Sequence, residues 1–116
     1  MSEVAYQGAR KRIVWASDTS SRKHGKEYFD ELPRQDKAKL QVLFERMADQ
    51  GEVRNTQKFR VEKDGFYCFK SFQRRLMCFF DGDDIVITQG FTKKRDKLDS
   101  KELDRAARIK DNYKRP

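Results

Sequence analysis

FYCFKSFQRRLMCFFDGDDIVITQ, residues 66–89, is the stretch that decides the fold. It contains three short runs rich in aromatic and β-branched residues, a composition typical of β-strands: 66–71, 75–80 and 85–89. The Asp81-Gly82 pair between the last two runs is typical of a tight hairpin turn. Together with a further extended run at 59–61, the stretch predicts a meander of successive antiparallel strands.

The register of this meander depends on the position of its turns. A turn centred near Gln73 would place Cys68 opposite Cys78 and Arg75 near Ser71. Because side chains alternate between the two faces of a strand, a slip of one residue would reverse the face of each of them.

Upstream of the meander the apolar pattern is helical. Four apolar residues recur at the spacing of one helix face: Leu40, Leu43, Phe44 and Met47. Pro33 suits the first turn of this helix, and Gly51 is a plausible cap at its end. A shorter helix is expected just before it, over residues 26–32.

The two ends of the chain carry weaker patterns. Residues 12–16 have the β-branched and aromatic content of a first strand, whereas residues 1–8 lack any period and are predicted to form a loose leader. Asp99 and Glu102 have the spacing of a helix capping box, which predicts a closing helix. We expect residues 1–116 to form one α+β domain.

The positive charge of the chain is clustered. The formal net charge is +8, and three segments carry most of the cations. Residues 9–26 have six Lys or Arg against one acidic residue, residues 54–75 have seven against two, and residues 92–116 have ten against five. Segments of this kind favour a polyanionic partner such as nucleic acid, although a soluble basic surface would have the same composition.

Several classes of protein are disfavoured by the sequence. No apolar run reaches the roughly 18 residues of a membrane span, and the N-terminus lacks the apolar region of a signal peptide, so we expect a cytoplasmic protein without a membrane partner. Cys68 and Cys78 lack the spacing of a metal or redox site and are interpreted as packed apolar residues. With His24 as the only histidine, we expect no metal and no cofactor.

The candidate functional residues are therefore cations on or beside the predicted strands: Lys58, Arg60, Lys70, Arg74, Arg75, Lys93 and Lys94. The sheet could gather these charges on one concave face. Exposed cations on strands also protect sheet edges from pairing with other chains, so their presence alone does not establish a site.

Five motifs occur in an order that resembles a known family. Three lie in the meander: Gly65-Phe66-Tyr67-Cys68-Phe69-Lys70, Arg75-Leu76-Met77-Cys78-Phe79 and Gly90-Phe91-Thr92-Lys93-Lys94. Two others frame them: Phe29-Asp30-Glu31-Leu32-Pro33 and Glu102-Leu103-Asp104-Arg105-Ala106. Over about residues 26–107 the chain resembles the phage-derived HigB-like toxins of the RelE/ParE superfamily.

The resemblance implies a RelE-like twisted antiparallel sheet of about four strands, with two N-terminal helices packed on one side and a short C-terminal helix. It also implies a metal-independent endoribonuclease that cuts mRNA in the decoding site of the 70S ribosome and so inhibits translation. Such a toxin belongs to a type II toxin-antitoxin system, and its expected partner is a helix-turn-helix antitoxin.

The resemblance also implies roles for individual residues. Arg75 matches the arginine at the start of the family's third strand and is expected to bind the scissile phosphate, a task that suits its forked guanidinium. Lys70, Lys93 and Lys94 match basic positions and remain open as general base, general acid or charge-stabilising groups. The residues expected to bind RNA are Lys58, Arg60, Tyr67, Arg74 and Arg95.

The sequence departs from the family at one point. RelE-type enzymes often have a tyrosine or histidine near the C-terminus, whereas residues 95–98 here are Arg-Asp-Lys-Leu, and Tyr113 is the candidate replacement. Tyr67 could stack on a base or belong to the sheet core. Two other functions stay open. A non-catalytic RNA- or ribosome-binding module would explain the missing tyrosine or histidine, and a ParE-like gyrase inhibitor would use the same superfamily scaffold.

Overall fold

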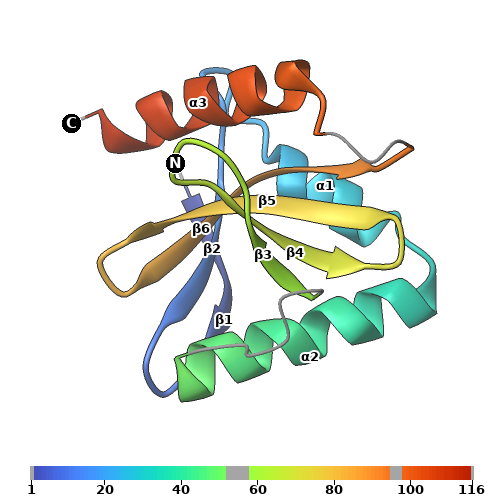
Figure 1. Cartoon of the computed structure of the whole chain (residues 1–116). Helices are drawn as coiled ribbons and strands as arrows, with labels where there is room; N and C mark the ends of the chain where they lie inside the picture. The colour runs from blue at the N-terminus through green and yellow to red at the C-terminus, as the bar shows by residue number, and fades with distance from the viewer. Residues whose placement is uncertain (1, 52–57, 95–97, 116) are drawn as a thin grey trace.

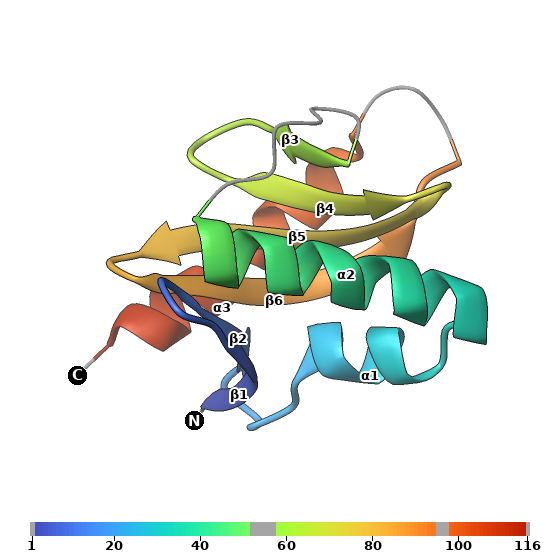
Figure 2. The ribbon, with the colours of Figure 1, turned by 90° about the horizontal axis from the view of Figure 1, so that it is seen from below.

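A computed structural model describes residues 2–51, 58–94 and 98–115 of the chain. Within these residues one sheet lies between two helical layers (Figures 1 and 2). The elements in chain order are β1 (Ser2–Gln7), β2 (Arg12–Ala16), α1 (His24–Asp30), α2 (Arg34–Gln50), β3 (Phe59–Val61), β4 (Tyr67–Ser71), β5 (Arg74–Asp81), β6 (Asp84–Thr92) and α3 (Ser100–Lys114).

The sheet is not the antiparallel sheet of about four strands that the sequence predicted. It has six strands in the order β1-β2-β6-β5-β4-β3 and is mixed, because β2 runs parallel to β6. The parallel pair brings Arg12 beside Asp84, 72 residues away, and a crossover of this length leaves no local sequence signal. Two strands, not helices, therefore open the fold.

The predicted loose leader was also wrong, because Ser2–Gln7 forms β1 and pairs antiparallel with β2. The residues of β1 are exposed or half-buried, and its register shifts between Val4 and Tyr6. An edge strand with such an irregularity has no regular alternation of apolar and polar residues, so its sequence resembles a loop.

The register of the hairpin between β4 and β5 differs from the predicted one by one residue. Phe72 and Gln73 alone join the strands, so Lys70 pairs with Arg75 and Cys68 pairs with Met77. A turn of two residues is the commonest hairpin connection, and it replaces the longer turn centred on Gln73. The predicted pairing of Cys68 with Cys78 is therefore wrong, as is the position of Arg75 near Ser71.

α1 and α2 cover one face of the sheet. The predicted apolar face of α2 is confirmed, since its four residues are buried in one cluster with residues such as Trp15 and Phe69. Gly51 ends the helix with φ +84°, and its N–H donates to Met47 O at 2.9 Å, as the cap prediction required. This layer sets the position of α2 beside β4.

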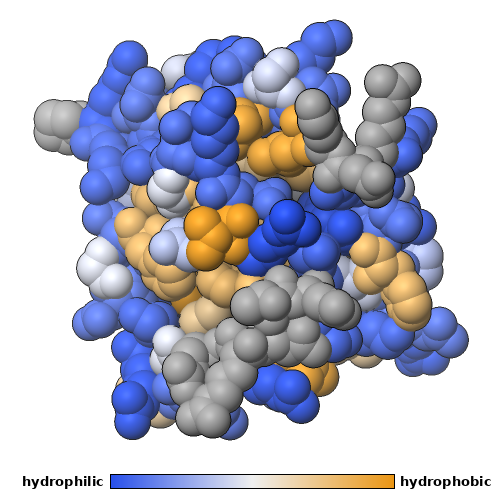
Figure 3. Space-filling view, in the orientation of Figure 1, coloured by the Kyte–Doolittle hydropathy of each residue, from blue (hydrophilic) through white to orange (hydrophobic). Residues whose placement is uncertain are grey.

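α3 covers part of the opposite face. Asp99 caps it as predicted, because its Oδ1 accepts a hydrogen bond of 2.9 Å from the Lys101 N–H. Ala106 and Ile109 are buried against the sheet, and Tyr113 packs its ring on Phe79 with 5.8 Å between centroids. Figure 3 shows apolar side chains still visible over the sheet below α3, within a largely hydrophilic surface.

The two cysteines are buried in the sheet, in agreement with their interpretation as packed apolar residues. Burial raises the pKa of the Cys68 thiol to about 12, so the thiol stays protonated at neutral pH. None of the helices in the described part of the chain is both long and apolar enough to cross a membrane.

The contact between α1 and β6 at Gly90 gives a test of the packing. A Cβ at this position would overlap the ring of Tyr28 and approach Leu76 Cδ2 to 2.9 Å. Because overpacking of a core typically costs about 1–3 kcal/mol, we expect Gly90→Ala to lower the free energy of unfolding by about this amount in urea denaturation followed by tryptophan fluorescence. Ala107→Ser, at an exposed position of α3, is the control and should change it by less than about 0.5 kcal/mol. Equal stability of Gly90→Ala and the parent would contradict this packing.

Candidate functional site

Basic side chains gather at the end of the sheet where β4 turns into β5. Lys70 pairs with Arg75 across this hairpin, and Arg60 on β3 pairs with Cys68. Because every second residue of a strand points to the same face, Arg60, Lys70 and Arg75 share one face of the sheet. This is the face that α3 covers in part, since Cys68 and Met77 belong to the core beneath that helix.

These cations line an open hollow of about 490 Å³, a volume in the range of ligand sites. Lys39 from α2 and Lys58, just before β3, add further positive charge to it. Among the described residues, the lining of this cationic hollow consists of Lys39, Lys58, Arg60, Lys70, Ser71, Phe72 and Arg75. Five of the seven are cationic and none is acidic, so the electrostatic field of the hollow favours an anion.

Arg75 is fixed at the back of the cationic hollow. Its side chain is buried, and Nη1 donates hydrogen bonds to Phe72 O at 2.5 Å and to Arg74 O at 3.0 Å. Burial lowers the pKa of Arg75, but a guanidinium remains charged at physiological pH. Among the described residues both bonds use Nη1, which leaves Nε and Nη2 for a ligand. The guanidinium is therefore oriented before any ligand binds.

Lys70 lies in the field of these neighbours. Its pKa is lowered, first by burial and then by the positive charges of Arg75, Arg60 and Lys93. Its backbone N–H donates to Lys58 O at 2.8 Å, which ties the start of β3 to β4. A lowered pKa favours the neutral form of a lysine, which is the form that can accept a proton.

Lys93 and Lys94 follow β6, as predicted, but neither belongs to the lining of the cationic hollow, and Lys93 lies near its edge. The Lys93 backbone N–H donates to Gln73 O at 2.7 Å, which holds it beside the β4–β5 turn. Both lysines line a second hollow of about 540 Å³ together with Asp99 and Glu102. The Asp99 carboxylate caps α3, and the Glu102 carboxylate accepts a hydrogen bond from Gln89. Their negative charges make this second hollow less suited to a polyanion.

Two predicted RNA-binding residues lie on the other face of the sheet. Tyr67 stacks on Phe59, with 5.4 Å between ring centroids and 11° between planes, which agrees with its alternative role in the core. Arg74 lies with Nε 3.5 Å from Asp36 Oδ2 and donates from Nη1 to Thr92 Oγ1 at 2.9 Å. Arg74 therefore links the sheet to α2. Arg95 lies outside the described residues.

Tyr113 does not replace the missing aromatic residue of the site. Its hydroxyl lies 3.5 Å from Asp84 Oδ2, beside the turn that joins β5 to β6. Asp84 pairs with Asp81, at the opposite end of β5 from Arg75. At about 3.3 Å per residue, this separates the two ends by roughly 20 Å.

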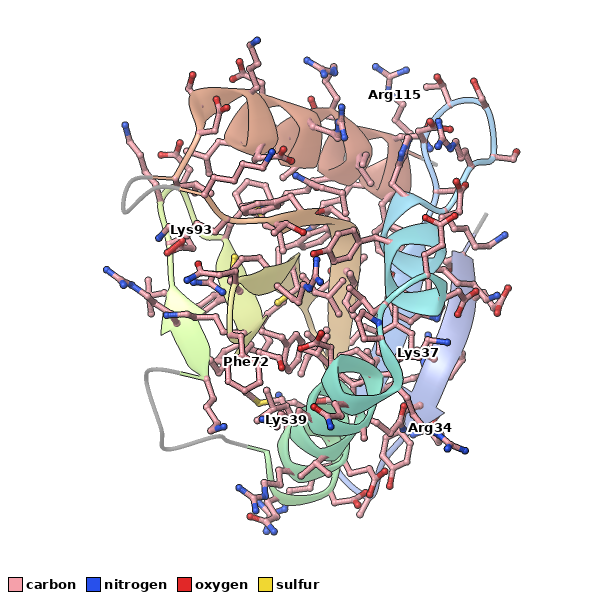
Figure 4. The ribbon with its side chains drawn as sticks, turned by 90° about the vertical axis from the view of Figure 1, so that its right-hand side faces the viewer. Arg34, Lys37, Lys39, Phe72, Lys93 and Arg115 are labelled. Atoms are coloured by element: carbon pink, nitrogen blue, oxygen red, sulfur yellow. The ribbon has the colours of Figure 1, made fainter. Side chains whose placement is uncertain are left out.

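Four residues of the site were not predicted from the sequence. Lys39 and Ser71 line the cationic hollow, Phe72 stands at its rim, and Glu62 lies with Oε1 3.7 Å from Arg60 Nε. The only available signal was an aromatic residue in the predicted turn region, at Phe72. Lys39 lies on α2 and precedes Phe72 by 33 residues, so only the tertiary fold brings the two together. Figure 4 shows Lys39 and Phe72 next to each other, with Lys93 further along the same side.

Comparison with known proteins identifies a family for this chain. A family profile described as phage derived protein Gp49-like matches residues 27–111. The matched range runs from α1 into α3 and includes every residue of the cationic hollow. No curated protein matches the chain.

The lowered pKa of Lys70 predicts that the positive charge of this side chain destabilises the folded state. Since the folded state disfavours the protonated ammonium, charged Lys70 destabilises the fold below its folded pKa, and this penalty declines as the pH rises through that pKa. We therefore expect Lys70→Met to raise the melting temperature by a few degrees at neutral pH and by less at alkaline pH. Thermal denaturation at several pH values measures both effects. Lys63→Met, in the exposed β3–β4 connection, is the control, and an equal rise in both variants would refute the argument.

Proposed function

Because the chain belongs to the family of phage-derived Gp49-like proteins, a family of the RelE toxin type, we propose that it is the toxin of a type II toxin-antitoxin system. In this proposal it is a HigB-like, metal-independent endoribonuclease that cleaves mRNA on the 70S ribosome and inhibits translation. The observation that carries the proposal is the cationic hollow, in which an oriented Arg75 lies beside a lysine with a lowered pKa.

Cleavage of RNA in such a site uses the substrate's own nucleophile. The ribose 2′-oxygen attacks the adjacent phosphorus, the bond from phosphorus to the 5′-oxygen breaks, and a 2′,3′-cyclic phosphate and a 5′-hydroxyl result. The reaction requires acceptance of the 2′-hydroxyl proton, donation of a proton to the leaving 5′-oxygen, and positive charge on the non-bridging oxygens.

The described residues can supply each of these roles. Arg75 would hold the non-bridging oxygens through Nε and Nη2, because Nη1 is engaged by the backbone. Neutral Lys70 would accept the 2′-hydroxyl proton, and the ammonium of Lys58 would protonate the leaving oxygen. Lys93 would contribute positive charge from the edge of the cationic hollow. Glu62, near Arg60, is a second candidate for the proton acceptor.

A toxin of this type requires a partner that neutralises it, and we propose a helix-turn-helix antitoxin encoded beside it. An acidic segment of that antitoxin would complement the charge of the cationic hollow. A small neighbouring gene whose product copurifies with this chain would support the assignment.

A non-catalytic RNA-binding module is the second candidate, and one observation favours it. Among the described residues lining the cationic hollow there is no imidazole, carboxylate or phenol, so proton transfer within the lining would depend on lysines, and Glu62 lies outside the lining. Such a module would bind RNA with the same salt dependence and create no new 5′-hydroxyl ends.

The catalytic proposal predicts that expression of the chain arrests growth and cuts translated messages. Loss of one group that stabilises the transition-state charge typically lowers a rate about 100- to 1000-fold, so Arg75→Ala should relieve both effects. Mapping of 5′-hydroxyl ends after brief induction measures the cleavage. Arg108→Ala on the exposed side of α3 is the control for Arg75→Ala, since each removes one positive charge. Because Arg75 is buried, the paired variant Lys93→Ala with Lys94→Ala is a second test. Intact messages with soluble protein would argue for the second candidate.

The cationic hollow also predicts the salt dependence of RNA binding. For single strands the logarithm of the binding constant falls with the logarithm of salt concentration by about 0.7 for each neutralised phosphate. We therefore expect Lys58→Ala to reduce this slope by about 0.7 in fluorescence anisotropy with an uncleavable single-stranded RNA. The exposed Lys63 gives the control variant Lys63→Ala, whose slope should equal that of the parent.

A further inference from the structure

Phe72 is an aromatic residue in a position where its side chain adds nothing to the core. It is 69% exposed, the highest value among the exposed large apolar residues of the described chain. Together with Gln73 it forms the whole connection between β4 and β5. Its ring belongs to neither of the two core clusters.

The backbone at Phe72 is also unfavourable for this residue. Its φ is +53°, whereas Gln73 is not among the residues with positive φ. A positive φ at the first central residue alone is the pattern of a type II′ hairpin turn, in which glycine is preferred because other residues are strained there. A bulky residue in this conformation lowers stability through backbone strain, and its exposed ring gains little from burial in return. Strained residues of this kind concentrate at functional sites.

Two contacts place Phe72 at the rim of the cationic hollow. Arg75 Nη1 donates to the carbonyl of Phe72 itself at 2.5 Å, so the guanidinium is held beside the backbone of Phe72. Lys39 Nζ lies 3.8 Å from the centroid of the ring, a cation–π contact that orients it. In Figure 4 the labelled Phe72 and Lys39 meet at the outer side of the β4–β5 hairpin. The ring therefore has a defined orientation while it remains open to a ligand.

We propose that Phe72 is the platform on which an unpaired base of the RNA stacks, next to the phosphate bound by Arg75. The inference rests on the proposed function, since it assigns the base-binding residue of that site. Base stacking on aromatic side chains is the usual way in which proteins hold single strands without reading their sequence. Lys39, behind the ring, would add charge for a neighbouring phosphate.

The competing explanation is structural. The contact between Lys39 and Phe72 also joins the hairpin to α2, so the ring could serve only to hold these elements together. That role predicts a loss of stability when the ring is removed. Stacking predicts the opposite, because Phe72→Gly removes strain and an exposed apolar ring from a turn that favours glycine.

The experiment is a cycle of protein variants and RNA modifications. Short 2′-O-methyl RNAs, which lack the nucleophilic hydroxyl and cannot be cut by this route, are prepared intact or with one abasic residue moved stepwise along the strand. Anisotropy then gives their dissociation constants for the parent, Phe72→Leu and Phe72→Trp. Val61→Ala, at a position that is 66% exposed, is the control for an exposed apolar residue.

We expect the parent to bind the intact strand about 5- to 150-fold more tightly than the strand that is abasic at one particular position, the range for a single stacked base. Phe72→Leu should lose this preference, Phe72→Trp should retain it, and Phe72→Gly should melt no lower than the parent. Equal losses of affinity for intact and abasic strands in Phe72→Leu would overturn the inference, as would a lower melting temperature of Phe72→Gly.

The same measurements separate this inference from the proposed function. A base preference that depends on Phe72, in a protein that leaves translated messages intact, would retain the stacking site and refute the ribonuclease. Cleavage that persists in Phe72→Leu, without any base preference in the parent, would retain the ribonuclease and refute the stacking site. If Phe72 contributes to the binding of a protein partner but not to the binding of RNA, the stacking site is likewise refuted.

Discussion

The register of the β4–β5 hairpin is the constraint on which the site depends. A connection of two residues makes Lys70 the partner of Arg75 and puts both on the face of the sheet that carries Cys68. With the longer turn expected from the sequence, Arg75 would lie near Ser71, whose hydroxyl here donates to Asp36 on the α2 side. Because each slip of one residue reverses the faces, that register would separate the two cations. The conformation of Phe72 and the geometry of the cationic hollow are thus consequences of one short turn.

Like charges at the end of a sheet destabilise it, and burial of the central strands offsets this destabilisation. The central strands are buried on both faces, by α1 and α2 on one side and by α3 on the other. Phe66, Met77 and Phe79 fill the core on the face of the cations, while carbonyl oxygens of the turn hold Arg75. The site therefore sits on a rigid support, and its unfavourable features are those expected where function opposes stability.

The sequence predicted the elements that depend on local patterns. The face of α2, the caps at Gly51 and Asp99 and the strands of the meander all follow from spacing within a few residues. It did not predict the parallel pairing of β2 with β6 or the edge strand β1, because these depend on contacts between distant segments. In the site, Lys70 and Arg75 were identified from their motifs, and the structure brings them together. Lys39 was missed because only the packing of α2 beside β4 brings it to the hairpin.

In the proposed reaction, the electrostatics of the cationic hollow would link substrate binding to proton transfer. In the free protein, burial and the charges of Arg75, Arg60 and Lys93 oppose protonation of Lys70. A phosphodiester bound at Arg75 brings negative charge that offsets these neighbours, so Lys70 holds a proton more strongly once the substrate is present. The lysine is thus most easily neutral before binding and becomes more basic beside the bound phosphate. In the proposed reaction, Lys70 would have to remain neutral until the 2′-hydroxyl proton is transferred, and the charges of Arg75, Arg60 and Lys93 favour that neutral form.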